Sequence, residues 1–130
     1  MTGNNYLLDT NIISALFKVE EIIASKITEA NEIYIPVIAI GELYYGAELT
    51  GDKSKYIIHI EDIKSSYPVL IVDEITVKQY GSIKAALRRK GKPIPENDIY
   101  IAALALQHNL AVATRDKHFK EIDGISIVEW

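Results

Sequence analysis

Four acidic residues lie where side chains often do chemistry in an α/β protein. Asp9 ends the run YLLD, Glu42 lies inside VIAIGELYYGAEL, Asp98 opens DIYIAALAL, and Asp116 follows LAVAT. Four carboxylates packed together would repel one another strongly unless a cation lay among them. An all-oxygen ligand set suits Mg²⁺ or Mn²⁺ rather than zinc. The pattern therefore predicts a divalent-metal site, at which an ion would activate a water and hold a phosphate.

Each of these acids also has an ordinary structural explanation. Asp9 and Asp116 suit helix N-caps, and Asp98 suits a first helical turn, where the helix dipole favours an acid. Glu42 could be a surface residue, although no basic residue stands at helical spacing to pair with it. Gly41, beside it, would leave room for a crowded cleft. Taken singly, each acid is explained without a metal, so the hypothesis depends on their convergence.

The elements that must position the acids alternate between strand-like and helix-like runs. Strands are expected at 5–9, 32–36, 69–73, 110–114 and 125–130, and helices at 11–17, 19–30, 37–50, 53–67, 74–91, 98–109 and 117–122. All the strands except 69–73 have almost no polar face, which is typical of strands covered by helices on both sides. The order favours a parallel α/β sandwich. Asp9 and Asp116 should then lie at the same carboxyl edge, where ligands bind.

Composition limits the class of protein. The 130 residues contain no recognisable linker or repeat, which predicts one domain over 1–130. The chain is 48% hydrophobic and has no cysteine, which argues against disorder and excludes disulfides and thiolate metal sites. No apolar run approaches the ~20 residues of a membrane span, and no signal peptide is evident. We therefore expect a cytoplasmic protein that does not enter a membrane.

Four segments together resemble a known family. LLDTNII, IGELYYGA, ENDIYIAALAL and ATRDKHF, in this order and spacing, resemble the PIN domain, and in particular the VapC-type ribonuclease toxins of prokaryotic toxin–antitoxin pairs. The resemblance implies a PIN-like three-layer sandwich, with a mostly parallel, twisted sheet flanked by helices on both faces. It also implies an endoribonuclease that depends on Mg²⁺ or Mn²⁺.

The resemblance assigns roles to particular residues. The metal-binding acids of the family fall on Asp9, Glu42, Asp98 and Asp116, and its supporting polar positions fall on Asn11 and Thr114. Thr10 and Asn97 are expected only to shape the backbone. Asp9 would be the central ligand, and either Glu42 or Asp98 would take the proton from the attacking water. No histidine is needed as a base, and His118 is expected to face solvent.

Basic residues are gathered in one segment despite the net charge of −4. KAALRRKGKP (84–93) carries five positive charges, and Lys84, Arg88 and Arg89 are expected to contact RNA phosphates. Arg115, beside the last acid, is expected to do the same. The alternative is a solvated helix end whose basic residues complement the dipole.

The sequence also bears on the partners of the protein and on alternative functions. The resemblance implies a cognate antitoxin and a homodimer. A catalytically silent PIN-fold binding module and a housekeeping RNA-processing nuclease are the alternatives. A phosphorylated receiver domain would need paired acids after the first strand, and a phosphatase with an Asp nucleophile would carry an acid where Asn11 stands. The RNA target, the number of ions and the general base are not determined by the sequence.

Overall fold

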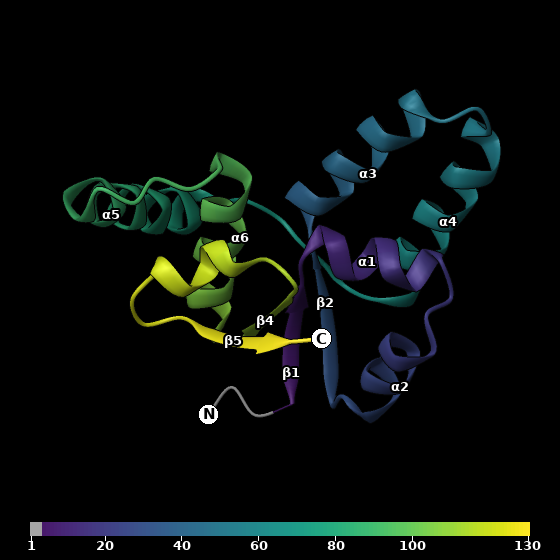
Figure 1. Ribbon diagram of the computed structural model, residues 1–130, viewed down its shortest axis with the longest axis horizontal. Helices are drawn as coiled ribbons and strands as arrows, with labels where there is room; N and C mark the ends of the chain where they lie inside the picture. The colour runs from purple at the N-terminus through teal and green to yellow at the C-terminus, as the bar shows by residue number, and fades with distance from the viewer. Residues whose placement is uncertain (1–3) are drawn as a thin grey trace.

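A parallel sheet forms the centre of the computed structural model, which describes residues 4–130 (Figure 1). Its strands are β1 (Asn5–Leu8), β2 (Glu32–Pro36), β3 (Val69–Leu70), β4 (Ala111–Thr114) and β5 (Ser126–Glu129). The spatial order is β3-β2-β1-β4-β5, and every neighbouring pair is parallel. β2 and β3 lie on one side of β1, and β4 and β5 lie on its other side. The order of the strands therefore reverses between β1 and β4.

Helices cover both faces of this sheet (Figure 1). On one face lie α1 (Thr10–Phe17), α2 (Glu21–Glu29), α3 (Val37–Leu49) and α4 (Lys53–Ser66). On the other lie α5 (Glu74–Lys90), α6 (Glu96–His108) and the short 3-10 helix η1 (Lys117–Glu121). Successive strand residues point to opposite faces, so Leu8 packs into the first core and Leu7 into the second. This arrangement confirms the predicted three-layer sandwich.

Two expectations about the edge strands were wrong, one about the length of a strand and one about how far a strand is covered. The strand expected at 69–73 is only Val69–Leu70, and Ile71 after it is 66% exposed. Asp73 instead caps α5, because its carboxylate accepts from Thr76 N at 3.0 Å while its own N–H donates to the Thr76 hydroxyl. β5 is the opposite edge strand, and its end residues Ser126 and Glu129 are exposed rather than covered.

The other element boundaries agree with the prediction to within two residues. One of these differences concerns the site: α6 begins at Glu96 and not at the predicted Asp98. Asp98 therefore lies inside the first turn of the helix. No helix within residues 4–130 combines the length and the apolar character that crossing a membrane requires.

The Phe119 side chain packs η1 against the second core, and its removal should destabilise the fold. Its side chain is fully buried among residues of α5, α6 and β4. Phe119→Ala should lower the free energy of unfolding by about 3–5 kcal/mol, because a large cavity replaces a packed ring. Urea unfolding measures the change. The control Val77→Ala, at a position 45% exposed, should stay within about 0.5 kcal/mol of wild type. Equal effects of the two substitutions would contradict the packing argument.

Candidate metal centre

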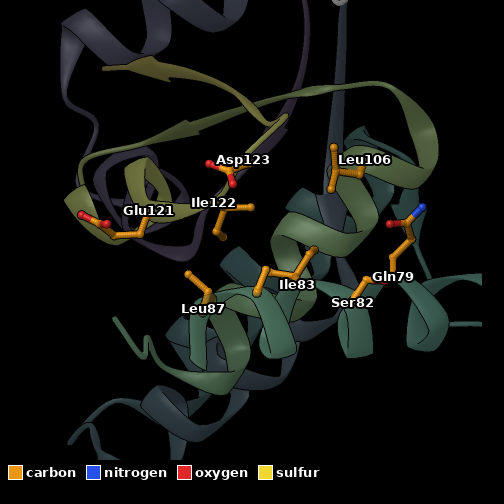
Figure 2. A pocket seen from close by; sticks show the side chains of 9 residues that line it. Gln79, Ser82, Ile83, Leu87, Leu106, Glu121, Ile122 and Asp123 are labelled. Atoms are coloured by element: carbon orange, nitrogen blue, oxygen red, sulfur yellow. The ribbon is translucent and has the colours of Figure 1, made fainter. Parts of the chain in front are cut away.

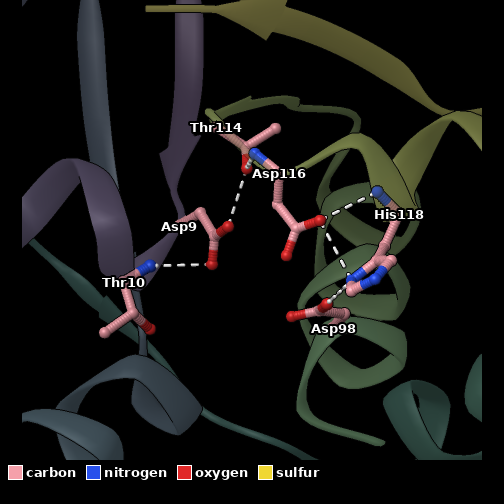
Figure 3. Close-up of polar contacts among 6 residues, drawn as sticks. All are labelled: Asp9, Thr10, Asp98, Thr114, Asp116 and His118. Atoms are coloured by element: carbon pink, nitrogen blue, oxygen red, sulfur yellow. Dashed lines mark hydrogen bonds and ion pairs between the residues drawn. The ribbon is translucent and has the colours of Figure 1, made fainter. Parts of the chain in front are cut away.

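The register between β1 and β4 brings Asp9 and Thr114 together. Leu8 is paired with Ala113, and Asp9 N donates to the Ala113 carbonyl at 2.9 Å. Thr114 therefore lies beside Asp9, and its hydroxyl donates to Asp9 Oδ2 at 2.7 Å across 105 positions of sequence (Figure 3). This is the edge at which the strand order reverses, the usual place for a ligand site in an open α/β sheet.

Asp9 and Asp116 are both helix caps, and both face this edge. Asp9 Oδ1 accepts from Thr10 N at 2.8 Å, at the start of α1. Asp116 Oδ1 accepts from His118 N at 2.9 Å, at the start of η1, while its own N–H donates to the Thr114 hydroxyl. The capping explanation is therefore correct for both residues. It does not exclude metal binding, because a carboxylate offers two oxygens and several lone pairs.

Asp98 approaches the same place from α6. It is the third residue of that helix, and its side chain is only 13% exposed. Its Oδ2 lies 3.2 Å from His118 Nδ1, and the same nitrogen lies 3.0 Å from Asp116 Oδ1 (Figure 3). One ligand atom from each of Asp98, Asp116 and His118 lies within 4.8 Å of the others. These side chains are close enough together to share one ion.

Glu42 joins the cluster through Thr10. The Thr10 hydroxyl donates to Glu42 Oε1 at 3.0 Å, and the Thr10 backbone N–H donates to Asp9. Glu42 is half-buried, and none of the ion pairs found within residues 4–130 involves it. The prediction that Gly41 relieves crowding beside it was wrong, because a side chain there would meet only open space.

The electrostatics indicate a cluster short of positive charge. Burial raises the pKa of Asp9 and of Glu42, and the hydrogen bonds from Thr114 and Thr10 offset only part of that. Burial likewise raises the pKa of Asp98, to about 6, with the Asp9 and Asp116 charges acting in the same direction. No lysine or arginine in the described chain forms an ion pair with any of these acids. Oxygen donors of this kind fit a hard divalent cation.

The predicted supporting residues act on the backbone and on Asp9. Asn11 Oδ1 accepts from Arg115 N at 3.3 Å, so it steadies the turn between β4 and η1. Thr114 accepts from Asp116 N and donates to Asp9, and it is nearly fully buried. Thr114 thus contacts the acids directly, whereas Asn11 contacts the adjoining backbone, and the supporting roles implied by the resemblance stay predictions.

The predicted RNA-contacting residues differ in how far their charges are compensated. Lys84 forms an ion pair with Glu96, and Arg115 pairs with Glu20 at 2.8 Å and donates to the Trp130 carbonyl. Arg88 and Arg89 lie exposed in the last turn of α5, and neither takes part in the ion pairs found between residues 4 and 130. RNA contact by any of the four stays a prediction, and it is better supported for Arg88 and Arg89.

A separate pocket lies between α5, α6 and the segment after η1 (Figure 2). Ile83, Leu87 and Ile122 supply apolar walls, and Glu121 and Asp123 lie at its side. None of the four predicted acids lines it. The chemistry predicted from the sequence therefore belongs to the carboxyl edge of the sheet and not to this hollow.

Comparison with known proteins identifies the family. The PIN domain model matches residues 6–125, so this chain belongs to the PIN domain family. The enzymes of this family depend on a divalent metal ion, and the acidic cluster is consistent with that requirement. Both the family and the fold predicted from the sequence are confirmed.

Individual proteins with known names are similar to this chain over most of its length. The chain is 34% identical over 128 residues to Ribonuclease VapC2 of Haemophilus influenzae, covering 96% of this chain and 97% of the relative. It is 38% identical over 122 residues to Toxin FitB of Neisseria gonorrhoeae, covering 85% and 86%. A chain of the DNA-bound VapBC structure of Salmonella typhimurium superimposes with a TM-score of 0.90 at 32% identity, covering 97% and 98%.

Two residues at the centre were assigned lesser roles from the sequence. Thr10 does more than shape the backbone, because its hydroxyl connects Glu42 to the cluster. His118 does not simply face solvent: its side chain is 50% exposed, but Nδ1 points to Asp98 and Asp116. Their positions, one residue after Asp9 and two after Asp116, were the available signals.

Binding of a divalent ion should weaken as the pH falls below about 6. The pKa of Asp98 is about 6 in the folded protein, and an ion binds its ionised form. Each proton that the ion must displace lowers the apparent affinity about tenfold per pH unit below that value. Calorimetric titration with Mn²⁺ between about pH 5 and about pH 7.5 measures the dependence. Asp98→Asn should flatten it, and the exposed control Asp62→Asn should not. An affinity that stays constant over this range would contradict the assignment.

Proposed function

We propose that this chain is a metal-dependent endoribonuclease that hydrolyses RNA phosphodiester bonds and is the toxin of a toxin–antitoxin pair. The observation that carries the proposal is the gathering of Asp9, Glu42, Asp98 and Asp116 at one edge of a PIN-domain sheet. The relatives named Ribonuclease VapC2 and Toxin FitB support both parts of it.

The residues have distinct roles in this proposal. Mg²⁺ or Mn²⁺, when bound, lowers the pKa of a water and holds the scissile phosphate. Asp9 would be the central ligand, since hydrogen bonds from the Thr114 hydroxyl and the Thr10 backbone N–H hold its two oxygens in place. Asp98 and Asp116 would supply further carboxylate oxygens to the ion. Glu42 and Asp98 are the candidates for accepting the proton of the attacking water, because burial raises the pKa of each toward the operating range of a general base.

The relatives support an antitoxin partner for this chain. VapBC is the assembly in which the Salmonella chain was solved, and this supports a cognate antitoxin for this chain. We place the activity in the cytoplasm, in a single nuclease domain over 1–130, with a homodimer as the functional form. A silent binding module is disfavoured because all four acids are present and lie at one edge of the sheet. The relatives named Ribonuclease VapC2 and Toxin FitB favour a toxin over a housekeeping RNA-processing nuclease.

Asp9→Asn should abolish cleavage of RNA while the fold persists. The substitution removes a charge from the cluster but keeps an oxygen for the Thr10 N–H. The loss of activity should exceed the roughly 10–100-fold that removal of an outer-sphere partner of a metal costs. Purified protein is incubated with total cellular RNA and Mn²⁺ or Mg²⁺, with EDTA in a parallel reaction.

The matched control for this experiment is Asp62→Asn, which changes an exposed acid on α4. It should cleave as wild type does, and EDTA should stop both. Absence of cleavage by metal-loaded wild-type protein, freed of any co-purified antitoxin, would favour the binding module. Unfolding of the Asp9→Asn protein would mean that capping is the main role of Asp9.

The double substitution Arg88→Ala and Arg89→Ala should weaken RNA binding and reduce its dependence on salt. If both guanidinium groups contact phosphates of a single strand, the slope of log affinity against log salt should fall in magnitude by about 1.4. The measurement uses the inactive Asp9→Asn protein, so that the RNA remains intact. Lys26→Ala with Lys55→Ala, which removes two positive charges from α2 and α4, is the charge-matched control. An unchanged slope would contradict an RNA-binding role for this helix end.

A further inference from the structure

The imidazole of His118 occupies a position between two acids that come from different elements. Its Nδ1 lies 3.2 Å from Asp98 Oδ2 and 3.0 Å from Asp116 Oδ1 (Figure 3). Within the described chain it is the one group able to carry positive charge that forms an ion pair with any of the four acids. The position of this ring therefore bears directly on how the cluster holds a cation.

We propose that His118 is a metal ligand, and that its Nδ1 binds the same ion as the carboxylate oxygens of Asp98 and Asp116. This inference rests on the proposed function, because it adds a ligand to the divalent-metal site assigned there. It changes the chemical class of the site from oxygen only to oxygen with one nitrogen. The four acids keep the roles described above, and so do the hydrogen bonds from Thr10 and Thr114.

The spacing of the three donor atoms supports this assignment. Ligands bonded to an ion at about 2.1 Å and at right angles to one another lie about 3 Å apart. The distances from Nδ1 to the Asp98 and Asp116 oxygens, 3.2 and 3.0 Å, match adjacent positions around one ion. The ligand atoms of the three side chains all lie within 4.8 Å of one another, so one ion can lie among them.

The backbone around His118 is held in place independently of any ion. The His118 N–H donates to Asp116 Oδ1 at 2.9 Å, and Phe119, the next residue, is fully buried. These two contacts fix the start of η1, so the ring is presented to the acids by a rigid segment. Pre-positioned ligands of this kind are expected at a metal site.

The alternative is that protonated His118 is a counter-ion that the metal displaces. The two explanations predict opposite effects of removing the ring. A displaced counter-ion competes with the metal, so its loss would tighten metal binding. A ligand contributes to affinity, so its loss weakens binding. Imidazole also suits transition metals better than Mg²⁺, so the ligand explanation predicts a preference for Mn²⁺ over Mg²⁺ that depends on His118.

The test is calorimetric titration of Mn²⁺ and of Mg²⁺ into wild-type, His118→Ala and His59→Ala proteins. His59 lies on α4, stacked on Phe17, and contacts none of the four acids, so it is the matched control. We expect His118→Ala to weaken Mn²⁺ binding at least about tenfold, with a smaller effect on Mg²⁺. His59→Ala should bind both ions as wild type does. Unchanged or tighter Mn²⁺ binding by His118→Ala would overturn the inference.

A spectroscopic measurement gives a second readout that does not require activity. Electron spin-echo spectra of Mn²⁺-loaded wild-type protein should contain modulation from a directly bound ¹⁴N nucleus, and His59→Ala should retain it. Absence of the nitrogen signal in wild type would overturn the inference even if His118→Ala failed to fold. Failure of wild type to bind Mn²⁺ at all would instead overturn the proposed function. Mn²⁺ binding without the nitrogen signal would leave that function standing with a site made of oxygens.

Discussion

Repulsion among carboxylates at the edge between β1 and β4 is the constraint around which this structure is organised. Two residues limit it, and they do so in the same way. Thr10 donates its backbone N–H to the strand-end acid Asp9 and its hydroxyl to the helix acid Glu42. His118 donates its backbone N–H to Asp116, and its ring lies against Asp98. Each strand-end acid is thus followed closely by a residue that connects it to an acid on a helix.

The parallel sheet makes this pairing possible. β1 and β4 end at the same level, so Asp9 and Thr114 meet without any long loop. α3 starts directly after β2 and places Glu42 in its second turn, and α6 places Asp98 in its first turn near the same edge. Burial raises the pKa of Asp9 and of Asp98, because partial exclusion of water disfavours the charged carboxylate.

The strands and helices were predictable because they depend on local patterns, and the meeting of Asp9 and Asp116 was predictable because parallel strands end at one edge of the sheet. Apolar runs fixed the central strands, and capping residues and glycines fixed the helix ends. The edge strands were predicted less well, since Ile71 is apolar but has no neighbouring strand to pair with. The pairing of Arg115 with Glu20 joins residues 95 positions apart, and no local pattern reveals it. The Lys84–Glu96 pair and the orientation of His118 likewise depend on tertiary packing.

The distance in sequence between Asp9 and its partner Thr114 also affects when the site can exist during synthesis. The central strand β1 is made before the other strands, and Thr114 of its neighbour β4 follows Asp9 by 105 positions. A nascent chain that has reached the end of α5 contains Asp9 and Glu42 but neither Asp98 nor Asp116. The cluster therefore cannot assemble until translation has passed Asp116.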